Sequence, residues 1–468
     1  MNFRHRALFR LAVLKMTALP VFIIMSLSAG AQEKFPGASL YHAKDTLNEN
    51  KGKLSGLARY FFMSTQNSGS LTDYSAHAAG LRLHYESKKI YGFSVGAGAS
   101  FTARIHSSNL DHVDSATGQK SRYEIGLFDM TDPSKKTMTR LDELYLKYHL
   151  NNGFIRAGRQ YLNTPFINTQ DGRMNMTATE GLWTELRFPK TKLEAGFLTG
   201  LSPRSTNSWY TIGHSIGLYP QGYNPDGTRP DLVNNLSSKG ILLVGFTHQL
   251  RPEWKITIWN QFVENIFNSS MLQIEGGKKW KNNKLSGAVQ YTRQQKINNG
   301  GNDDYSKTYF HDASSNVISA FAGLQALHWE TSLNYTHIFG SRYLMPREWG
   351  RDPFFTFLPR ERNEGFAEVN AYVLKTSISP FKQFKFLAAV GYFDLPSVKD
   401  CSSNKYGMPS YTQLNLELRY AFPKSFGSPD LAFLYVHKSR QGDIFQNQSY
   451  VINKVNMSLY NLIFNYKF

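Results

Sequence analysis

Arginine side chains occupy spaced positions in short segments whose apolar and polar residues alternate. Arg82, Arg187 and Arg419 each lie at a polar position of such a segment, and Glu185 and Glu417 lie two residues before the last two. A guanidinium group presents its N–H donors as a planar fork that matches both oxygens of a carboxylate. This pattern allows two kinds of chemistry: recognition of a carboxylate from solution, or internal ion pairs between the arginines and nearby acids.

The segments that carry these arginines alternate with a period of two residues. Residues 414–420 (LNLELRY) give the clearest case, and residues 81–86, 144–150 and 182–188 repeat the pattern. Successive side chains of a β-strand point to opposite faces, so each segment predicts a strand with one apolar and one polar face. No apolar stripe with helical spacing is sustained after the N-terminal segment. The sequence therefore predicts an all-β protein with many antiparallel strands.

The composition of the 468-residue chain excludes several classes of protein. Its aromatic fraction of 14% is too high for a disordered chain, and its mean hydropathy of −0.40 is too polar for a bundle of membrane-spanning helices. Cys401 is the only cysteine, which excludes an intramolecular disulfide and a thiolate-rich zinc or iron–sulfur site. The net charge of +18 suits either a nucleic-acid-binding protein or a pore that attracts anions.

The N-terminal segment decides between these two possibilities because it predicts export. Basic residues precede the short apolar run 19–27 (LPVFIIMSL), and residues 29–31 (AGA) form an A-x-A cleavage site. This order is typical of a secretory signal peptide, and the run is too short for a membrane anchor. We expect residues 1–31 to be removed and Gln32 to begin the mature chain, with an uncleaved anchor as the alternative. The mature chain keeps 49 of the 53 basic residues against 35 acidic ones, a net charge of +14, and we expect no nucleic-acid partner.

Two architectures give every strand one apolar and one polar face. In a soluble sandwich the apolar face forms the core, whereas in a transmembrane barrel it meets lipid and the polar face meets a wet lumen. The barrel is favoured because the chain has no linker that would divide it into several sandwiches. In addition, aromatic residues cluster near predicted strand ends at 60–62, 392–393 and 420–422, as in the aromatic girdles of membrane barrels.

The C-terminal segment also supports a barrel. Residues 460–468 place Tyr, Leu, Phe, Tyr and Phe at every second position, ending at Phe468. In a soluble protein such a strand would be an exposed edge, and here it resembles the signal that the outer-membrane barrel assembly machinery reads. We therefore expect residues 32–468 to form one barrel in the outer membrane of a Gram-negative-type cell, with outer-membrane lipid and the assembly machinery as partners. At roughly 20–28 residues for each strand with its turn or loop, the barrel has about 16 to 20 strands and an aqueous channel.

Several segments resemble the OprD-type family of substrate-specific outer-membrane porins. The most specific stretch is 158–181, which contains GRQ, TP, QDGR and EG in that order. Residues 57–62 (LARYFF), 260–267 (NQFVENIF), 347–353 (REWGRDP) and 359–365 (PRERNEG) also match in pattern. The resemblance spans nearly the whole mature chain, but loop lengths differ enough that a substrate preference cannot be carried over.

This resemblance implies an 18-stranded antiparallel barrel whose third outer loop folds inward and narrows the pore. In this chain the loop would run from about Tyr161 to Thr179. Its polar composition, with Asp171 and Arg173 among its charged residues, suits a segment inside a wet lumen, and a proline and a glycine allow sharp turns. The alternative is an ordinary external loop.

The resemblance also implies a ladder of arginines along one wall of the pore, opposite an acidic or hydroxyl-lined patch. The candidates for the ladder are Arg59, Arg82, Arg156, Arg159, Arg187, Arg347, Arg351, Arg360, Arg362 and Arg419. The candidates for the opposing acids are Asp171, Glu185 and Glu417. A narrow pore in a low-dielectric wall focuses the field of its lining charges, and those charges select the solute. We therefore expect passive diffusion of small hydrophilic, anionic or carboxylate-bearing solutes, unless these arginines and acids only pair with one another.

Other functions are open alternatives. A non-conducting barrel for adhesion or scaffolding would carry its function in large outer loops. A barrel hydrolase would need a nucleophile–base pair, and His84, His149 and His248 lie in strand-like segments without such a signature. Asp303 and Asp312 lie in an oxygen-rich loop whose spacing matches no calcium motif, so we expect no metal and no cofactor. Both a monomer and a homotrimer are compatible with the sequence.

Overall fold

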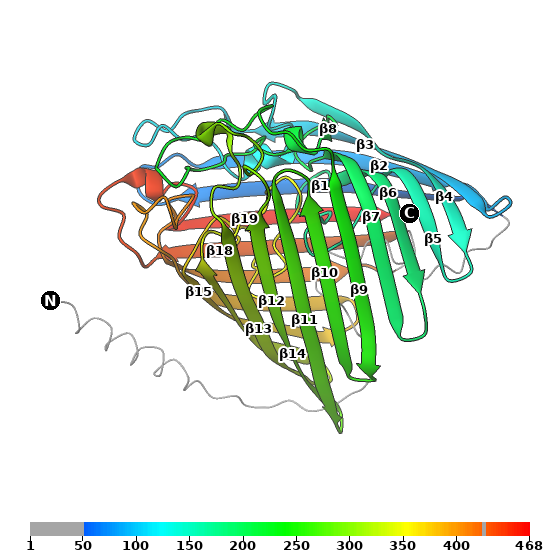
Figure 1. Cartoon of the computed structure of the whole chain (residues 1–468). Helices are drawn as coiled ribbons and strands as arrows, with labels where there is room; N and C mark the ends of the chain where they lie inside the picture. Colours follow the sequence, from blue (N-terminus) through cyan, green and yellow to red (C-terminus); the bar gives the residue numbers. More distant parts are fainter. Residues whose placement is uncertain (1–50, 424–426) are drawn as a thin grey trace. The chain divides into compact units, whose positions relative to one another are not determined.

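The computed structural model describes residues 51–423 and 427–468 (Figure 1). These residues belong to one compact unit, in which a single antiparallel sheet closes on itself. The closure joins the first strand to the last, with Leu57 opposite Lys467. In the described residues, eighteen strands form the wall and a two-residue strand is added to it, which confirms the expected all-β transmembrane barrel. The predicted signal peptide, residues 1–31, lies outside the described residues.

Nearly every strand pairs with the next one along the chain. The strands are β1 (Lys53–Asn67), β2 (Tyr74–Glu86), β3 (Phe93–Ser107), β4 (Thr137–Leu150), β5 (Gly153–Gln160), β6 (Ala178–Arg187), β7 (Thr191–Ser202), β8 (Tyr210–Thr211), β9 (Ile241–Arg251), β10 (Trp254–Val263), β11 (Phe267–Trp280), β12 (Asn283–Lys296), β13 (Ser314–Gln325), β14 (Trp329–Gly340), β15 (Val369–Phe381), β16 (Phe384–Asp394), β17 (Tyr411–Ala421), β18 (Ser428–Arg440) and β19 (Met457–Lys467). The short 3-10 helices are η1 (Glu124–Leu127), η2 (Gly213–Ser215), η3 (Tyr305–Lys307) and η5 (Gln448–Tyr450). The extra strand β8 pairs only with the end of β7, and β7 continues the wall to β9. None of the described helices is long and apolar enough to cross a membrane.

The period of two in the sequence sorts side chains between the outside and the inside of the barrel. Along β3, Val95 and Phe101 on one face are 48% and 45% exposed, whereas Ser94 and Thr102 on the other are 3% and 1% exposed. The exposed face is thus apolar and the buried face polar, the reverse of a soluble protein. An apolar outer face suits lipid chains, and a polar inner face suits a wet lumen.

The two ends of the barrel have connections of different length. Residues 151–152 join β4 to β5 and residues 252–253 join β9 to β10, whereas 108–136 and 341–368 are loops at the opposite end. In outer-membrane barrels the short turns face the periplasm and the long loops face the exterior. We call these the short-turn end and the long-loop end.

The hydrophobic core lies inside the barrel and is built from loops and wall together. Its largest cluster joins Phe166, Ile216 and Trp349 from three different loops to Trp183 and Trp259 of the wall. The rings of the two wall tryptophans stack with their centres 6.5 Å apart. Loops that bury apolar side chains against the inner wall are thereby held inside the lumen.

Candidate functional site

The loop between β5 and β6, residues 161–177, folds into the lumen, as expected. The Arg59 side chain on β1 donates to the carbonyl of Arg173 at 2.7 Å, and the Arg140 side chain on β4 donates to the carbonyl of Met176. Both arginines lie on the inner face of the wall. The loop is therefore tied to the inner wall at two strands, and we call it the constriction loop.

A second loop, residues 341–368 between β14 and β15, also folds into the lumen. Gln294 of β12 donates to the carbonyl of Leu344 at 2.7 Å, and Lys438 of β18 donates to the carbonyl of Arg360 at 3.1 Å. This second lumen loop therefore contacts the inner wall from β12 to β18.

The two lumen loops also bind each other. Arg362 Nη2 donates to Gln170 Oε1 at 2.9 Å, and Asn168 Nδ2 donates to the carbonyl of Arg351 at 3.0 Å. The loops thus form one hydrogen-bonded body inside the barrel.

Four arginines gather where the loops meet, and we call them the arginine cluster: Arg173, Arg204, Arg360 and Arg362. Arg173 and Arg360 both donate to the carbonyl of Gly172, at 2.9 and 3.5 Å. Each of the four keeps one buried guanidinium nitrogen that has no hydrogen-bond partner. In the described residues none of the four lies within 4.0 Å of a carboxylate, unlike the neighbouring Arg59. The cluster therefore combines buried positive charge with unused donors.

Burial and mutual repulsion lower the pKa values in this cluster. The pKa of Arg173 is lowered to about 9 by burial and then by Arg360, and the pKa of Arg204 is lowered to about 9 by burial and then by Arg173. The pKa of Arg360 is lowered to about 10 by burial and then by Arg204. Like charges at close range disfavour the charged form of each group, and an anion placed among them would relieve that repulsion.

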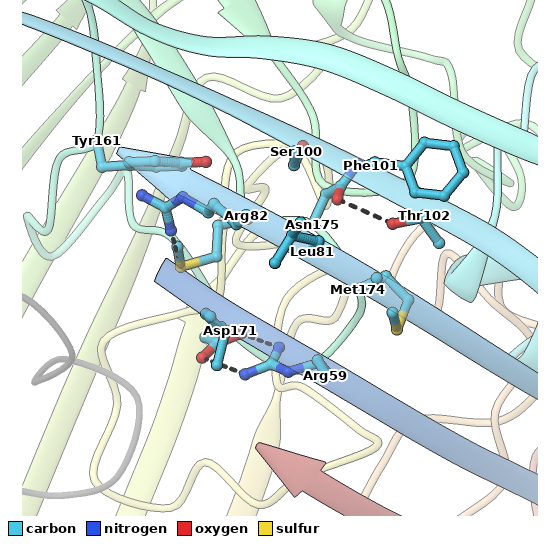
Figure 2. A pocket seen from close by; sticks show the side chains of 13 residues that line it. Arg59, Leu81, Arg82, Ser100, Phe101, Thr102, Tyr161, Asp171, Met174 and Asn175 are labelled. Carbon is cyan, nitrogen blue, oxygen red and sulfur yellow. Dashed lines mark hydrogen bonds and ion pairs between the residues drawn. The ribbon is translucent and has the colours of Figure 1, made fainter. Parts of the chain in front are cut away.

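Two of the predicted arginines, Arg59 and Arg82, form ion pairs beside the constriction loop, and Figure 2 shows both side chains with the pair between Arg59 and Asp171. Arg59 contacts both oxygens of Asp171, at 2.5 and 3.0 Å. Arg82 donates to Glu143 at 2.9 Å, and its guanidinium lies 4.1 Å from the centre of the Tyr161 ring. Arg59, Arg82 and Tyr161 line a small pocket between the wall and the loop.

Two further predicted pairs lie on the inner face near the short-turn end. Arg187 contacts Glu185 at 2.6 Å, and Arg419 contacts Glu417 two residues away on the same strand. All three acids proposed to oppose the ladder, including Asp171, therefore pair with an arginine. The alternative in which the arginines only pair with these acids therefore holds for Arg59, Arg187 and Arg419.

Arg156 and Arg159 lie on opposite faces of β5. The guanidinium of Arg156 lies on the inner face, 5.0 Å from the centre of the Tyr145 ring. Arg159 lies opposite Leu144, which is 49% exposed on the outer face, and it pairs with Glu180 at 3.0 Å. The expectation that Arg159 lines the lumen is corrected here, since residues three apart on a strand point to opposite faces.

The other two predicted arginines of the second lumen loop contact loop side chains. Arg347 donates to Glu364 at 2.5 Å, and its guanidinium lies 3.8 Å from the centre of the Tyr406 ring. Arg351 lies 5.0 Å from the centre of the Phe357 ring. These contacts hold the loop in shape. Arg347 also keeps a buried nitrogen, Nη2, without a hydrogen-bond partner, but unlike the arginine cluster it lies within 4.0 Å of two carboxylates, those of Glu361 and Glu364.

Sequence reasoning missed Arg140, Arg204 and Lys438. Arg140 and Lys438 lie on strands and bind Asp142 and Glu361, the latter at 3.1 Å. The period of two could have placed Arg140 on the inner face, because Arg140 and Asp142 flank the apolar Leu141. It could not have placed Lys438, because Val436 on the same face is apolar although it is buried. Arg204 lies in the irregular loop after β7, where no period exists to indicate it.

The residues weighed for metal binding have other partners. Asp303 accepts a hydrogen bond from Asn299, and Asp312 lies 3.7 Å from Arg342. Within residues 51–423 and 427–468 no group of three or more His, Cys, Asp or Glu side chains is arranged to hold a metal ion.

Several solved structures share this fold at low sequence identity. OccAB2 of Acinetobacter baumannii is 12% identical with a TM-score of 0.70, over 89% of this chain and 98% of that one. OccAB4 of the same organism is 16% identical with a TM-score of 0.66, over 90% and 99% of the two chains. OpdK of Pseudomonas aeruginosa, in a structure with vanillate, is 12% identical with a TM-score of 0.64, over 89% and 98%.

A family model supplies the classification that such low identities do not. No curated protein sequence matches the chain. The family described as outer membrane porin, OprD family, matches residues 50–349. Proteins of this family are channels of the Gram-negative outer membrane, so neither a hydrolase nor an adhesion scaffold describes this protein. Because the match covers well over half of the sequence, the chain belongs to the OprD family of outer-membrane porins.

Proposed function

We propose that this channel passes small anionic solutes, and carboxylate-bearing solutes in particular, by passive diffusion. The arginine cluster carries the proposal, because its buried guanidinium nitrogens have donors without partners. A buried donor left unsatisfied costs about 1–3 kcal/mol, and a solute that accepts a hydrogen bond there removes that cost. A carboxylate suits the site best, since its two oxygens match the guanidinium fork.

Basic side chains on the wall support a path through the lumen. Arg82, Arg156 and Arg187 lie on the inner faces of β2, β5 and β6. The acids beside them, Glu143 and Glu185, compensate only part of this charge. A low-dielectric wall focuses the remaining positive field into the lumen and raises the local concentration of anions.

One structural neighbour supports the choice of a carboxylate. OpdK is described in a structure with vanillate, and vanillate is an aromatic carboxylate. The likeness to that protein is one of fold, at 12% identity. It supports a class of solute for this channel, defined by its carboxylate, and not a particular compound.

Single-channel recording tests the proposal. The purified mature protein is placed in a planar bilayer under a KCl gradient, and vanillate is then added on one side. We expect discrete conductance steps, a reversal potential on the anion side, and a transient reduction of the KCl current when vanillate occupies the arginine cluster. A reversal potential on the cation side would contradict the proposed selectivity. The absence of steps from folded, inserted protein would contradict diffusion altogether.

A second part of the proposal concerns assembly. β19 pairs with both β18 and β1, and Phe468 follows it as the last residue of the chain. We propose that this strand, with its aromatic and aliphatic outer residues, is the segment that the barrel assembly machinery reads.

A further inference from the structure

A hairpin at the short-turn end carries more positive charge than any other turn described. β11 and β12, green in Figure 1, are joined at residues 278–284 (KKWKNNK), which contain four lysines and no acid. In the described part of the chain, none of these lysines lies within 4.0 Å of a carboxylate, although Lys255 and Glu275 close by form a 2.9 Å pair. The hairpin therefore presents uncompensated charge.

The strand register assigns three of the four lysines to a face of the barrel. Lys279 lies directly opposite Lys284 on the inner face. Lys278 lies opposite Leu285, which is 59% exposed on the outer face. Lys281 lies in the turn between the strands, and its Nζ approaches the ring of Trp280, which lies on the outer face. Lys278 and Lys281 thus form an outward pair, and Lys279 and Lys284 form an inward pair.

Tryptophan side chains flank the outward pair. Trp280 shares the outer face with Lys278 and is 66% exposed, and Lys281 Nζ lies 6.0 Å from the centre of its ring. Trp254 of β10 is 47% exposed and lies flat over Gly276, where an added Cβ would come within 2.8 Å of its ring. Tryptophan prefers the headgroup level of a bilayer, and lysine extends its ammonium group from an apolar surface to that level.

We propose that Lys278 and Lys281, together with Trp254 and Trp280, bind the phosphate headgroup of an anionic phospholipid in the periplasmic leaflet. The short-turn end faces the periplasm, so the outer face of this hairpin meets the leaflet on that side. Clustered lysines attract anionic headgroups, and the indole rings hold the glycerol and upper acyl region. The inward pair faces the lumen and takes no part. This site is independent of the solute path proposed above.

Native mass spectrometry of the full-length mature protein in detergent, titrated with phosphatidylglycerol, tests the site. We expect the double variant Lys278→Gln/Lys281→Gln to bind this lipid about tenfold or more weakly, since each lysine near an anionic headgroup contributes on the order of 1 kcal/mol. The matched control is Lys279→Gln/Lys284→Gln, which removes the same charge from the same hairpin on the other face. It should bind phosphatidylglycerol as the parent does.

Each other outcome overturns the proposal. Equal losses in both variants would show a general charge effect, and no loss in either would show that the outward pair does not bind lipid. Displacement of the lipid by about 10 mM inorganic phosphate would assign the site to free phosphate. A second measurement leaves all four lysines in place, so it tests the site even if the lysine variants fold poorly. Phosphatidylglycerol brominated on its acyl chains should quench the fluorescence of the parent protein more than that of Trp280→Phe, and equal quenching would contradict the site.

Discussion

Arg59 on β1 and Asp171 in the constriction loop form a two-point ion pair, with contacts of 2.5 and 3.0 Å between side chains that are 6% and 11% exposed. The same guanidinium donates to the Arg173 carbonyl and to Asn465 Oδ1, both at 2.7 Å. One side chain thereby joins the first strand, the last strand and the loop that narrows the lumen.

Removal of the Asp171 charge should release the constriction loop. In Asp171→Asn the buried Arg59 loses its counter-ion, and breaking a buried pair in this way costs about 3–5 kcal/mol. We expect a larger and noisier single-channel conductance at neutral pH. Arg159→Gln, which breaks a pair on the outer face, is the matched control and should leave the conductance unchanged. Parent-like conductance in Asp171→Asn would show that the other contacts of the constriction loop are sufficient to hold it in place.

The arginine cluster should set the ion preference. Arg173→Gln/Arg360→Gln removes two buried charges, each worth about 1 kcal/mol to an anion at 4 Å even with the dielectric constant of water. We therefore expect the anion-to-cation permeability ratio, from reversal potentials, to fall about fivefold or more. Arg293 of β12 is exposed on the outer face, opposite Ser270. Arg159→Gln/Arg293→Gln therefore removes equal charge from the outer face and should keep the parent ratio. An equal fall of the permeability ratio in that control would show that the overall charge of the protein, and not the arginine cluster, sets the ion preference.

The ion preference should also depend on pH. The pKa values of Arg173 and Arg204 are lowered to about 9 and that of Arg360 to about 10. A basic group with a lowered pKa loses its charge as the pH rises through that value, so these three arginines are charged at pH 7 and progressively neutral above pH 8. Reversal potentials at pH 7, 8, 9 and 10 should show a falling anion preference. A preference that stays constant up to pH 10 would contradict this assignment.

The C-terminal residue should be needed for barrel closure. The backbone of Phe468 makes two hydrogen bonds with Gly56, at 2.7 and 3.1 Å, and its ring covers that glycine, where an added Cβ would come within 2.2 Å of the ring. We expect Phe468→Ala and Gly56→Ala each to lower the fraction of heat-modifiable, folded barrel, the latter by overpacking that costs about 1–3 kcal/mol. Gly323→Ala, where an added Cβ meets no atom closer than 3.4 Å, is the strand control and should fold normally.

The wall of the barrel was predictable because each strand repeats one simple rule. An apolar outer residue and a polar inner residue alternate, as Phe101 and Thr102 do, and each repeat requires only local sequence. The same rule places Arg159 outside, three residues from the inward Arg156, whereas its expected position in the lumen came from the family resemblance. A resemblance to a family predicts that a constriction loop exists. The strand register, however, determines whether a given side chain points into the lumen or outward.

The partners of the lumen charges could not be read from the sequence. Arg82 binds Glu143, 61 residues away, and Lys438 binds Glu361, 77 residues away. Strand parity assigns a face but does not identify which distant residue shares it. The inward path of the second lumen loop, and with it the position of Arg360, depends on contacts with several strands that no local pattern encodes.

The position of Arg59 at the junction of β1 and β19 has a consequence for biogenesis. Its contact with Asn465 joins residues 406 positions apart, so this contact forms only when the whole chain has been exported and its last strand has met its first. The constriction loop is synthesised long before that moment and shares the same anchor. We therefore expect the anchorage of the constriction loop at Arg59 to be completed only when the barrel closes.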